Sequence, residues 1–217
     1  MFGDLTVEEL RGLLPDLREH RYARGETVWA EGDRSESLFV VAEGQLKTFR
    51  VGRDGGEVIL ELHSSNDLFG DVGLFHPSRH RLANVVAMEA SHCLSVARRP
   101  LLEFLAAHPV AMERMLERLS TAAGKAALSL SEVAFEDIRS RVAAALLTLA
   151  EEFGEMTPGG VRIRLKLSQG TLGALVAASR ENVNRALGSL IAEGAVSQQS
   201  GHFVLHDRGA LERDSHL

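Results

Sequence analysis

The first hundred residues alternate between short apolar runs and polar, glycine-containing turns. Asp-Gly and Gly-Gly steps separate several of the runs, and glycine supplies the positive φ that tight hairpins require. Short strands at such regular spacing leave no room for crossover helices, so the pattern predicts a β-roll or small barrel. A short helix is predicted ahead of it, over residues 7–14. The predicted strands cover residues 27–29, 38–41, 46–51, 58–62, 84–88 and 92–97.

From residue 100 onward the apolar positions recur at alternating steps of four and three, which is the rhythm of a heptad seam. No proline interrupts residues 110–134, so one long helix is predicted there. The seam could pack on its own domain, but a helix this long beside a small barrel favours pairing with a second copy. We therefore expect a homodimer. The seam positions are Met112, Leu116, Leu119, Ala123, Ala126, Leu130 and Val133.

The C-terminal part predicts a winged helix-turn-helix. Asp137, Ser168 and Ser179 are candidate N-caps, because each side-chain oxygen can accept a backbone N–H that the first helical turn leaves unpaired. Helix, tight turn, helix and small β-hairpin is the order of that motif. The predicted elements are a helix over 138–153, a loop over 154–160, a strand over 161–165, helices over 169–176 and 180–192, and a hairpin that turns at residues 200–201.

These patterns predict an α+β protein in three parts. They are an N-terminal β-roll sensor domain over residues 1–108, a dimerisation helix and hinge over 109–136, and a C-terminal winged helix-turn-helix over 137–217.

Charge and cysteine content narrow the class of protein. There are 24 Lys and Arg against 30 Asp and Glu, which argues against a non-specific nucleic-acid coat. A local basic site is still compatible with this balance, because salt screens surface charge beyond about 10 Å. Cys93 is the single cysteine, so no intramolecular disulfide can form. With no basic leader and no long apolar run, we expect a cytoplasmic protein without a membrane partner.

The second helix of the motif carries Arg180, Glu181 and Arg185 at its exposed start. An arginine fork matches the two acceptors of guanine in the major groove, and a carboxylate suits the cytosine amine. Surface ion pairs worth under about 1 kcal/mol are the alternative interpretation. Ser168, Gln169 and Thr171 would hold phosphates. Ser179 and Asn184 complete the predicted DNA-binding set.

Residues 179–185, S-R-E-N-V-N-R, resemble the recognition-helix start S-R-E-T-V-x-R of the CRP/FNR family of bacterial transcription regulators. The similarity extends over nearly the whole chain. It implies a cyclic-nucleotide-binding-like β-roll, RNA polymerase as a partner, and a palindromic, bent site in double-stranded DNA with TGTGA-type arms. Arg180 and Arg185 would recognise guanines and Glu181 the cytosine side. Dimer symmetry would place the two half-sites about 34 Å apart.

Residues 61–85 resemble the phosphate-binding cassette of that family, which has the pattern F-G-E-x-x-L and then R-[ST]-A-x-V. Gly70 matches the glycine whose amide faces the ligand, and Arg81 matches the arginine that pairs with the ligand phosphate. A guanidinium with free amides is a strong anion site. The resemblance therefore makes cyclic AMP the candidate ligand.

Several positions depart from the cassette pattern. Asp71 replaces the glutamate that accepts the ribose hydroxyl, and Leu82 replaces a hydroxyl-bearing residue. Ala126 and Ala127 stand where the family has its adenine-contacting Thr-Ser pair. Buried hydrogen-bond partners give such a pocket its discrimination, and these residues cannot supply them. A degenerate or effector-independent pocket, a working cyclic-nucleotide site and a site for another anion all stay open, and Arg81 could instead be an ion-pair partner of Asp71.

Other functions are less well supported. An iron–sulfur cluster needs about four thiolates, which Cys93 alone excludes within one chain, and we expect Cys93 to be a buried small hydrophobe. His76 and His80 could ligate haem, although lone loop histidines are more often solvated, so no metal site is predicted. No nucleophile elbow, P-loop or acid–base pair indicates an enzyme. A ligand-sensing module that acts mainly through protein contacts is the alternative function.

Overall fold

The computed structural model describes residues 13–53 and 55–215. They form two compact units, each described by itself. The first takes in the described residues up to Arg50 together with Leu60–Ala126, and the second takes in Val51–Ile59 and the described residues from Ala127 onward. The helix predicted over residues 7–14 lies almost entirely outside the described residues.

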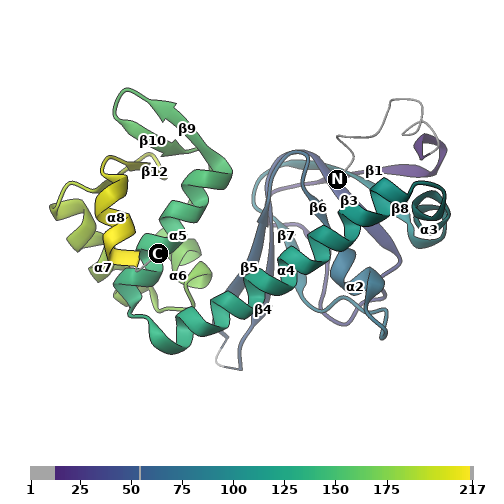
Figure 1. Cartoon of the computed structure of the whole chain (residues 1–217), viewed down its shortest axis with the longest axis horizontal. Coiled ribbons are helices and arrows are strands. Elements are labelled where there is room, and N and C mark those ends of the chain that lie inside the picture. The colour runs from purple at the N-terminus through teal and green to yellow at the C-terminus, as the bar shows by residue number, and fades with distance from the viewer. Residues whose placement is uncertain (1–12, 54, 216–217) are drawn as a thin grey trace. The chain divides into compact units, whose positions relative to one another are not determined.

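Two antiparallel four-stranded sheets make up the β-roll, in the orders β1-β8-β3-β6 and β2-β7-β4-β5 (Figure 1). Phe39 and Cys93 from the first sheet share one buried cluster with Leu46 and Val85 from the second, so the sheets pack face to face. The predicted strands are confirmed. The bounds are β1 (Leu17–Tyr22), β2 (Thr27–Trp29), β3 (Ser37–Glu43), β4 (Leu46–Val51), β5 (Glu57–His63), β6 (Leu68–Phe69), β7 (Asn84–Ala87) and β8 (Ser91–Ala97).

Three helices accompany these strands. They are α2 (Asp71–Phe75), α3 (Arg98–Ala107) and α4 (Pro109–Phe135), and a 3₁₀ turn η1 (Leu14–Asp16) precedes β1. Leu101 and Leu105 of α3 and Met115 of α4 join Leu38 and Val96 of the sheet in a second buried cluster. Burial of such side chains stabilises each by about 1.5–3 kcal/mol relative to exposure, so α3 and the start of α4 are fixed to the β-roll.

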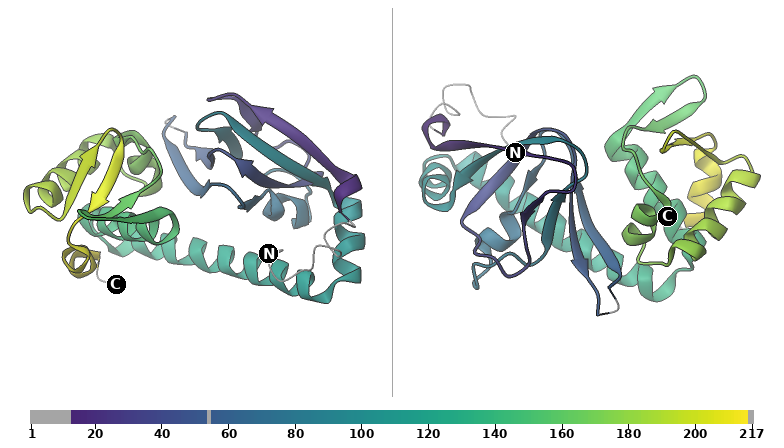
Figure 2. Two further views of the ribbon diagram at one scale, coloured as in Figure 1. Left: turned by 90° about the horizontal axis from the view of Figure 1, so that it is seen from above. Right: turned by 180° about the vertical axis from the view of Figure 1, so that it is seen from behind.

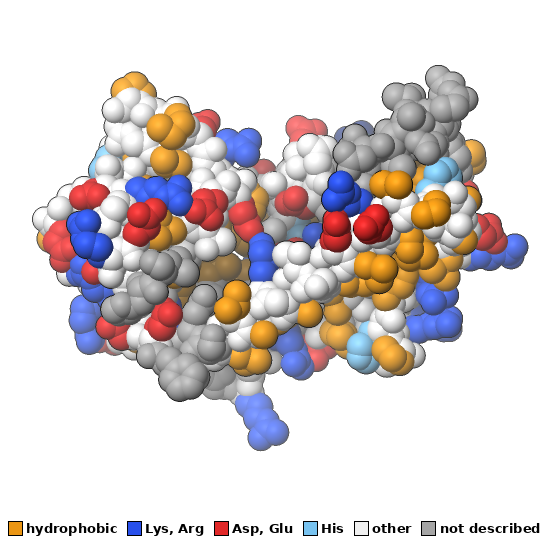
Figure 3. All heavy atoms as spheres, in the orientation of Figure 1, with side chains coloured by type: hydrophobic (Ala, Val, Ile, Leu, Met, Phe, Trp, Pro, Cys, Tyr) orange, Lys and Arg blue, Asp and Glu red, His pale blue; other side chains and the backbone are white. Residues whose placement is uncertain are grey.

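The long helix α4 confirms the continuous helix expected from the heptad rhythm. Ala111 and Met115 are buried, whereas Leu116, Leu130 and Val133 are 60, 74 and 51% exposed. Ala123 and Ala126 are exposed as well. Met112 and Leu119 of the predicted seam are half-buried against the second cluster. The other seam positions are exposed in the single chain, and apolar side chains reach the surface along this helix (Figure 3).

Besides residues 57–59 of β5 and 127–135 of α4, the second unit contains a four-stranded sheet and four further helices in its described residues. The bounds are α5 (Ile138–Phe153), β9 (Gly154–Thr157), β10 (Gly160–Ile163), α6 (Gln169–Leu175), α7 (Arg180–Ala192), β11 (Val196–Gln199), β12 (His202–Leu205) and α8 (Arg208–Ser215). The sheet order is β11-β12-β10-β9, and the β9–β10 hairpin extends beyond the helices of this unit (Figure 2).

The loop predicted over residues 154–160 is wrong in part. Residues 154–157 form strand β9, and Thr157 pairs with Gly160 across a tight turn. β9 is an edge strand whose Met156 is 82% exposed, so it lacks the alternating apolar pattern of a half-buried strand. The predicted strand over 161–165 is also shorter, because β10 ends at Ile163.

Candidate DNA interface and ligand pocket

The two predicted serine caps begin the two helices of the helix-turn-helix. The Ser168 Oγ accepts a hydrogen bond of 3.0 Å from the Thr171 amide at the start of α6. The Ser179 Oγ accepts one of 3.3 Å from the Asn182 amide at the start of α7. A cap of this kind stabilises a helix by about 1 kcal/mol. The caps fix the residues at which both helices begin.

A glycine makes the tight turn between the helices possible. Ala177 adopts a left-handed φ of 48°, and the Ala178 amide donates to the Gly173 carbonyl at 2.9 Å. A Cβ on Gly173 would lie 2.9 Å from the Ala178 carbonyl oxygen, closer than packed atoms allow. Gly173 therefore lets the end of the turn approach α6.

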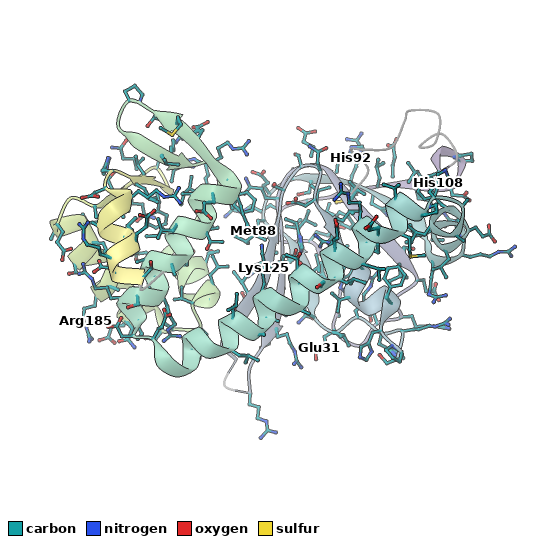
Figure 4. All side chains as sticks on the ribbon, viewed as in Figure 1. Glu31, Met88, His92, His108, Lys125 and Arg185 are labelled. Atoms are coloured by element: carbon teal, nitrogen blue, oxygen red, sulfur yellow. The ribbon has the colours of Figure 1, made fainter. Side chains whose placement is uncertain are left out.

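The recognition-type helix α7 separates apolar and charged faces. Val183, Leu187 and Leu190 are buried, whereas Arg180, Glu181, Asn184 and Arg185 are exposed. The Arg185 Nη2 donates to the Glu181 Oε1 at 3.3 Å, and Arg185 lies at the surface of the second unit (Figure 4). These side chains are 74 and 86% exposed, so their pairing is weak and can yield to another partner.

Two arginines on α5 hold the ends of these helices, and sequence reasoning missed both. The Arg141 Nη1 donates to the Val176 carbonyl at the end of α6 at 2.7 Å. The Arg139 Nη2 donates to Glu193 at 2.6 Å and to Asp214 of α8 at 2.6 Å, and its Nη1 contacts the Ser189 hydroxyl. The hydrogen bonds to Glu193 and Asp214 raise the pKa of Arg139, which keeps it charged.

Gly70 and Arg81 meet in the first unit, as the cassette resemblance predicts. Gly70 has a left-handed φ of 86° directly before α2. The Arg81 Nη1 donates to the Gly70 carbonyl at 2.9 Å, and Nη2 donates to the Ser37 carbonyl at 2.8 Å. A Cβ on Gly70 would lie 2.5 Å from the Arg81 Nη1, so this contact requires glycine.

The Arg81 side chain is enclosed. Its guanidinium carbon lies 3.8 Å from the centroid of the Trp29 ring, and the residue is 5% exposed. Burial lowers the pKa of Arg81 to about 10, so the group is still charged at neutral pH.

The alternative in which Arg81 is the ion-pair partner of Asp71 is not what the structure shows, because Asp71 pairs with Arg118 of α4. The Arg118 Nε lies 2.8 Å from the Asp71 Oδ2. The Arg118 Nη2 donates to the Leu68 carbonyl at 2.6 Å and to Glu61 at 3.2 Å. Burial opposes charge on Arg118, but the carboxylates of Asp71 and Glu61 outweigh it and the pKa of Arg118 is raised. Sequence reasoning missed Arg118 because it considered only the seam of α4.

Aromatic rings pack beside Arg81. Trp29 lies 5.4 Å from Phe69 and 5.2 Å from Phe39 between ring centroids. His63 stacks on Phe69 at 5.1 Å, and its Nε2 is 2.7 Å from the Thr48 hydroxyl. Its Nδ1 is buried without a hydrogen-bond partner among the described residues. Burial, with a smaller contribution from Arg118, lowers the pKa of His63 to about 3, so this ring is neutral at physiological pH.

Cyclic AMP does not fit these residues. The Asp71 carboxylate, which the resemblance assigns to the ribose hydroxyl, is held by Arg118. Leu82 is 41% exposed and has no hydroxyl. Ala126 and Ala127 are exposed on α4 and carry no polar side-chain atom for a base. A neutral ribose hydroxyl cannot replace the guanidinium as counter-charge for a buried carboxylate.

The remaining candidates are His76, His80 and Cys93. His76 and His80 are exposed, and their Nδ1 atoms lie 2.8 Å from the Ser78 hydroxyl and 2.6 Å from the Ser78 carbonyl, respectively. No three His, Cys, Asp or Glu side chains come together as metal ligands in the described part of the chain. Cys93 is buried, as expected for a small hydrophobe, and burial raises the pKa of its thiol to about 11. None of the helices in residues 13–53 and 55–215 has the length and apolarity needed to cross a lipid bilayer.

Two family models match this chain. The cyclic nucleotide-binding domain matches residues 19–108, and the Crp-like helix-turn-helix domain matches residues 140–214.

Named relatives match over almost their full length. The chain is 29% identical over 213 residues to a CRP-like cAMP-activated global transcriptional regulator of Mycobacterium tuberculosis, covering 98% of this chain and 95% of the relative. It is 30% identical over 212 residues to the cyclic AMP receptor protein of Thermus thermophilus, covering 98 and 94%. Among solved structures, the c-di-GMP responsive global regulator CLP of Xanthomonas campestris matches with a TM-score of 0.78 and 23% identity, covering 93% of this chain and all of that chain.

Proposed function

The chain belongs to the CRP/FNR family of transcription regulators, and from this premise we propose that it is a homodimer that recognises a palindromic DNA site with TGTGA-type arms. The observation that carries the proposal is the exposed, capped start of α7. Arg180, Glu181 and Arg185 all project from the face of that helix that is not buried.

These three side chains have the chemistry that base recognition needs. In the proposal, Arg180 and Arg185 each donate two hydrogen bonds to a guanine edge, and Glu181 accepts from a cytosine amine. The ion pair between Glu181 and Arg185 spans one helical turn and holds the two groups side by side before DNA arrives. Asn184 lies exposed between them and is available to an adjacent base.

Phosphate contacts would come from the preceding helix. The Ser168 and Thr171 hydroxyls lie 2.9 Å apart, and Gln169 is next to them. In the proposal these side chains fix the register of α7 without recognising sequence. Lys and Arg on the same unit supply the salt-dependent part of the affinity.

Dimerisation through the exposed seam of α4 would present two copies of α7 to successive turns of the duplex. The half-sites would then lie about 34 Å apart. A regulator bound in this way acts in the cytoplasm and has RNA polymerase as its second partner, and no enzymatic step is part of the proposal. Regulation mainly through protein contacts is the competing function, and it predicts no preferred DNA sequence.

Selection of bound duplexes from a random pool tests the proposal, and a palindrome with TGTGA-like arms is the expected product. Arg180→Ala should weaken binding to that duplex about 5- to 150-fold for each of its two arms, which corresponds to about 1–3 kcal/mol per bidentate contact. It should also relax one guanine position in each arm. The control is Arg208→Ala, which removes an equally charged, exposed side chain from α8. If random DNA competes as well as the selected duplex for the unmodified protein, the proposal fails.

A further inference from the structure

We propose that Arg118 is an internal counter-ion that replaces the nucleotide in the effector pocket, so that this regulator binds its DNA site without a cyclic nucleotide. The inference rests on the proposed function as a DNA-binding regulator. It starts from the disagreement between the cyclic nucleotide-binding domain of this chain and the residues that occupy its pocket.

The first step is the pairing of the acceptor in the cassette with a cation. The Asp71 side chain is 3% exposed, and its Oδ2 accepts a hydrogen bond of 2.8 Å from the Arg118 Nε. A buried carboxylate that loses its cationic partner is strongly destabilised. A ribose hydroxyl brings a dipole and no positive charge, so it cannot displace Arg118 from this position at equal stability.

The second step is the enclosure of Arg81, the arginine that the family resemblance assigns to the ligand phosphate. Arg81 uses both terminal nitrogens on the Gly70 and Ser37 carbonyls, and one face of its guanidinium lies on the Trp29 ring. Hydrogen bonds from a charged donor are stronger than neutral ones, so breaking these two costs free energy. These bonds leave a phosphate only the remaining N–H groups of the guanidinium.

The third step is the aromatic packing around these charges. Trp29, Phe39 and Phe69 are in mutual ring contact, with centroids 5.2–5.4 Å apart. His63 extends the group by stacking on Phe69. Because protein interiors are close-packed, a phosphate that approached Arg81 from this side would meet rings that already contact one another and the guanidinium.

Arg118 also supplies the connection that a ligand would otherwise make. The family resemblance has the nucleotide bridging the cassette and the long helix. Here a side chain of α4 itself binds acceptors on β5, β6 and α2, through Glu61, Leu68 and Asp71. The bridge is covalently part of the chain, so its effective concentration does not depend on any metabolite.

The direct test measures the affinity of the full-length protein for its selected duplex at fixed salt, with and without saturating cyclic AMP. We expect tight binding in both cases, with a change of less than about twofold, because a ligand that does not discriminate between states shifts nothing. A gain of about tenfold or more with cyclic AMP overturns the inference and leaves the proposed function intact. Absence of sequence-specific binding under both conditions contradicts the proposed function itself.

A second measurement examines the bridge. Arg118→Gln keeps a polar side chain but removes the charge, and we expect it to lower DNA affinity at least about tenfold, with no recovery when cyclic AMP is added. Its control is Arg114→Gln, which neutralises an exposed arginine one turn earlier on the same helix. Asp71→Asn combined with Arg118→Gln should be no worse than the worse single change, because both remove the same pair. The inference fails if Arg118→Gln binds DNA with full affinity. It also fails if the losses of DNA affinity add up in the double variant, because the pair would then not stabilise the DNA-binding state.

Discussion

At the scale of single residues, His63 is a titratable group held where its charged form is disfavoured. The residue is 1% exposed, and burial lowers the pKa of its ring to about 3. In the unfolded chain that pKa returns to about 6.5. Between these two values the unfolded state binds the extra proton, so the free energy of unfolding falls as the pH falls below about 6.5.

We expect the first unit to lose about 2 kcal/mol of unfolding free energy between pH 7 and pH 5, and His63→Leu to remove most of this dependence. Urea unfolding at several pH values measures it. The single tryptophan, Trp29, lies in the packed ring group of this unit and reports its unfolding by fluorescence. His80→Gln alters an exposed histidine and should leave the slope unchanged. An unaltered slope in His63→Leu would contradict the assignment.

At the scale of elements, the close contact between Gly173 and the turn before α7 determines how the two helices meet. Gly173→Ala would place a Cβ 2.9 Å from the Ala178 carbonyl oxygen. We expect this change to cost about 1–3 kcal/mol of stability and to weaken DNA binding, since the start of α7 must shift. Thermal unfolding and duplex affinity measure the two effects.

At a second glycine, substitution by alanine is expected to raise stability instead of lowering it. Gly188 lies within α7, and a Cβ there meets nothing within 4 Å. Gly188→Ala should therefore stabilise the second unit by about 0.5–1 kcal/mol through helix propensity. Equal effects at the two positions would refute the packing argument for Gly173.

Apolar period and capping residues were sufficient to predict most elements. Six strands of the β-roll, helices α4 to α7 and the serine caps follow from local pattern, because each depends on neighbours within a few residues. β1 has the sequence L-R-E-H-R-Y. Its charged residues hide the apolar pattern of a strand, so it was not predicted, although it pairs with β8. Helix α8 was not predicted either, because its sequence, R-G-A-L-E-R-D-S, is mostly polar.

The residues of the candidate site were likewise predicted only where a local sequence pattern marks them. Gly70 and Arg81 were identified through the cassette pattern, whereas Arg118 and Arg139 were not. Arg118 reaches Asp71 across 47 residues of sequence, and Arg139 reaches Asp214 across 75. No local sequence pattern predicts such contacts, because the partners come together only when the chain folds.

At the scale of the whole molecule, the exposed seam of α4 makes oligomerisation testable. Leu116 and Leu130 are 60 and 74% exposed in the single chain. If two copies bury this seam against each other, Leu116→Glu with Leu130→Glu should give monomers. Duplex affinity should then fall at least about tenfold, because one recognition helix binds without its twin.

Analytical ultracentrifugation gives the oligomeric state, and titration of the selected duplex gives the affinity. Leu128→Glu is the control, because it alters an apolar residue of α4 that is 64% exposed and lies off the seam. A double seam variant that is still dimeric would place the subunit contact elsewhere.

The buried position of Cys93 has a practical consequence for labelling. It is the single cysteine of the chain, its side chain is fully buried, and burial raises the pKa of its thiol to about 11. At neutral pH about one such thiol in ten thousand is ionised, and only the thiolate attacks maleimides efficiently. A cysteine introduced at exposed Ala90, in the turn between β7 and β8, would therefore take up a fluorophore or spin probe alone, with no native residue to remove.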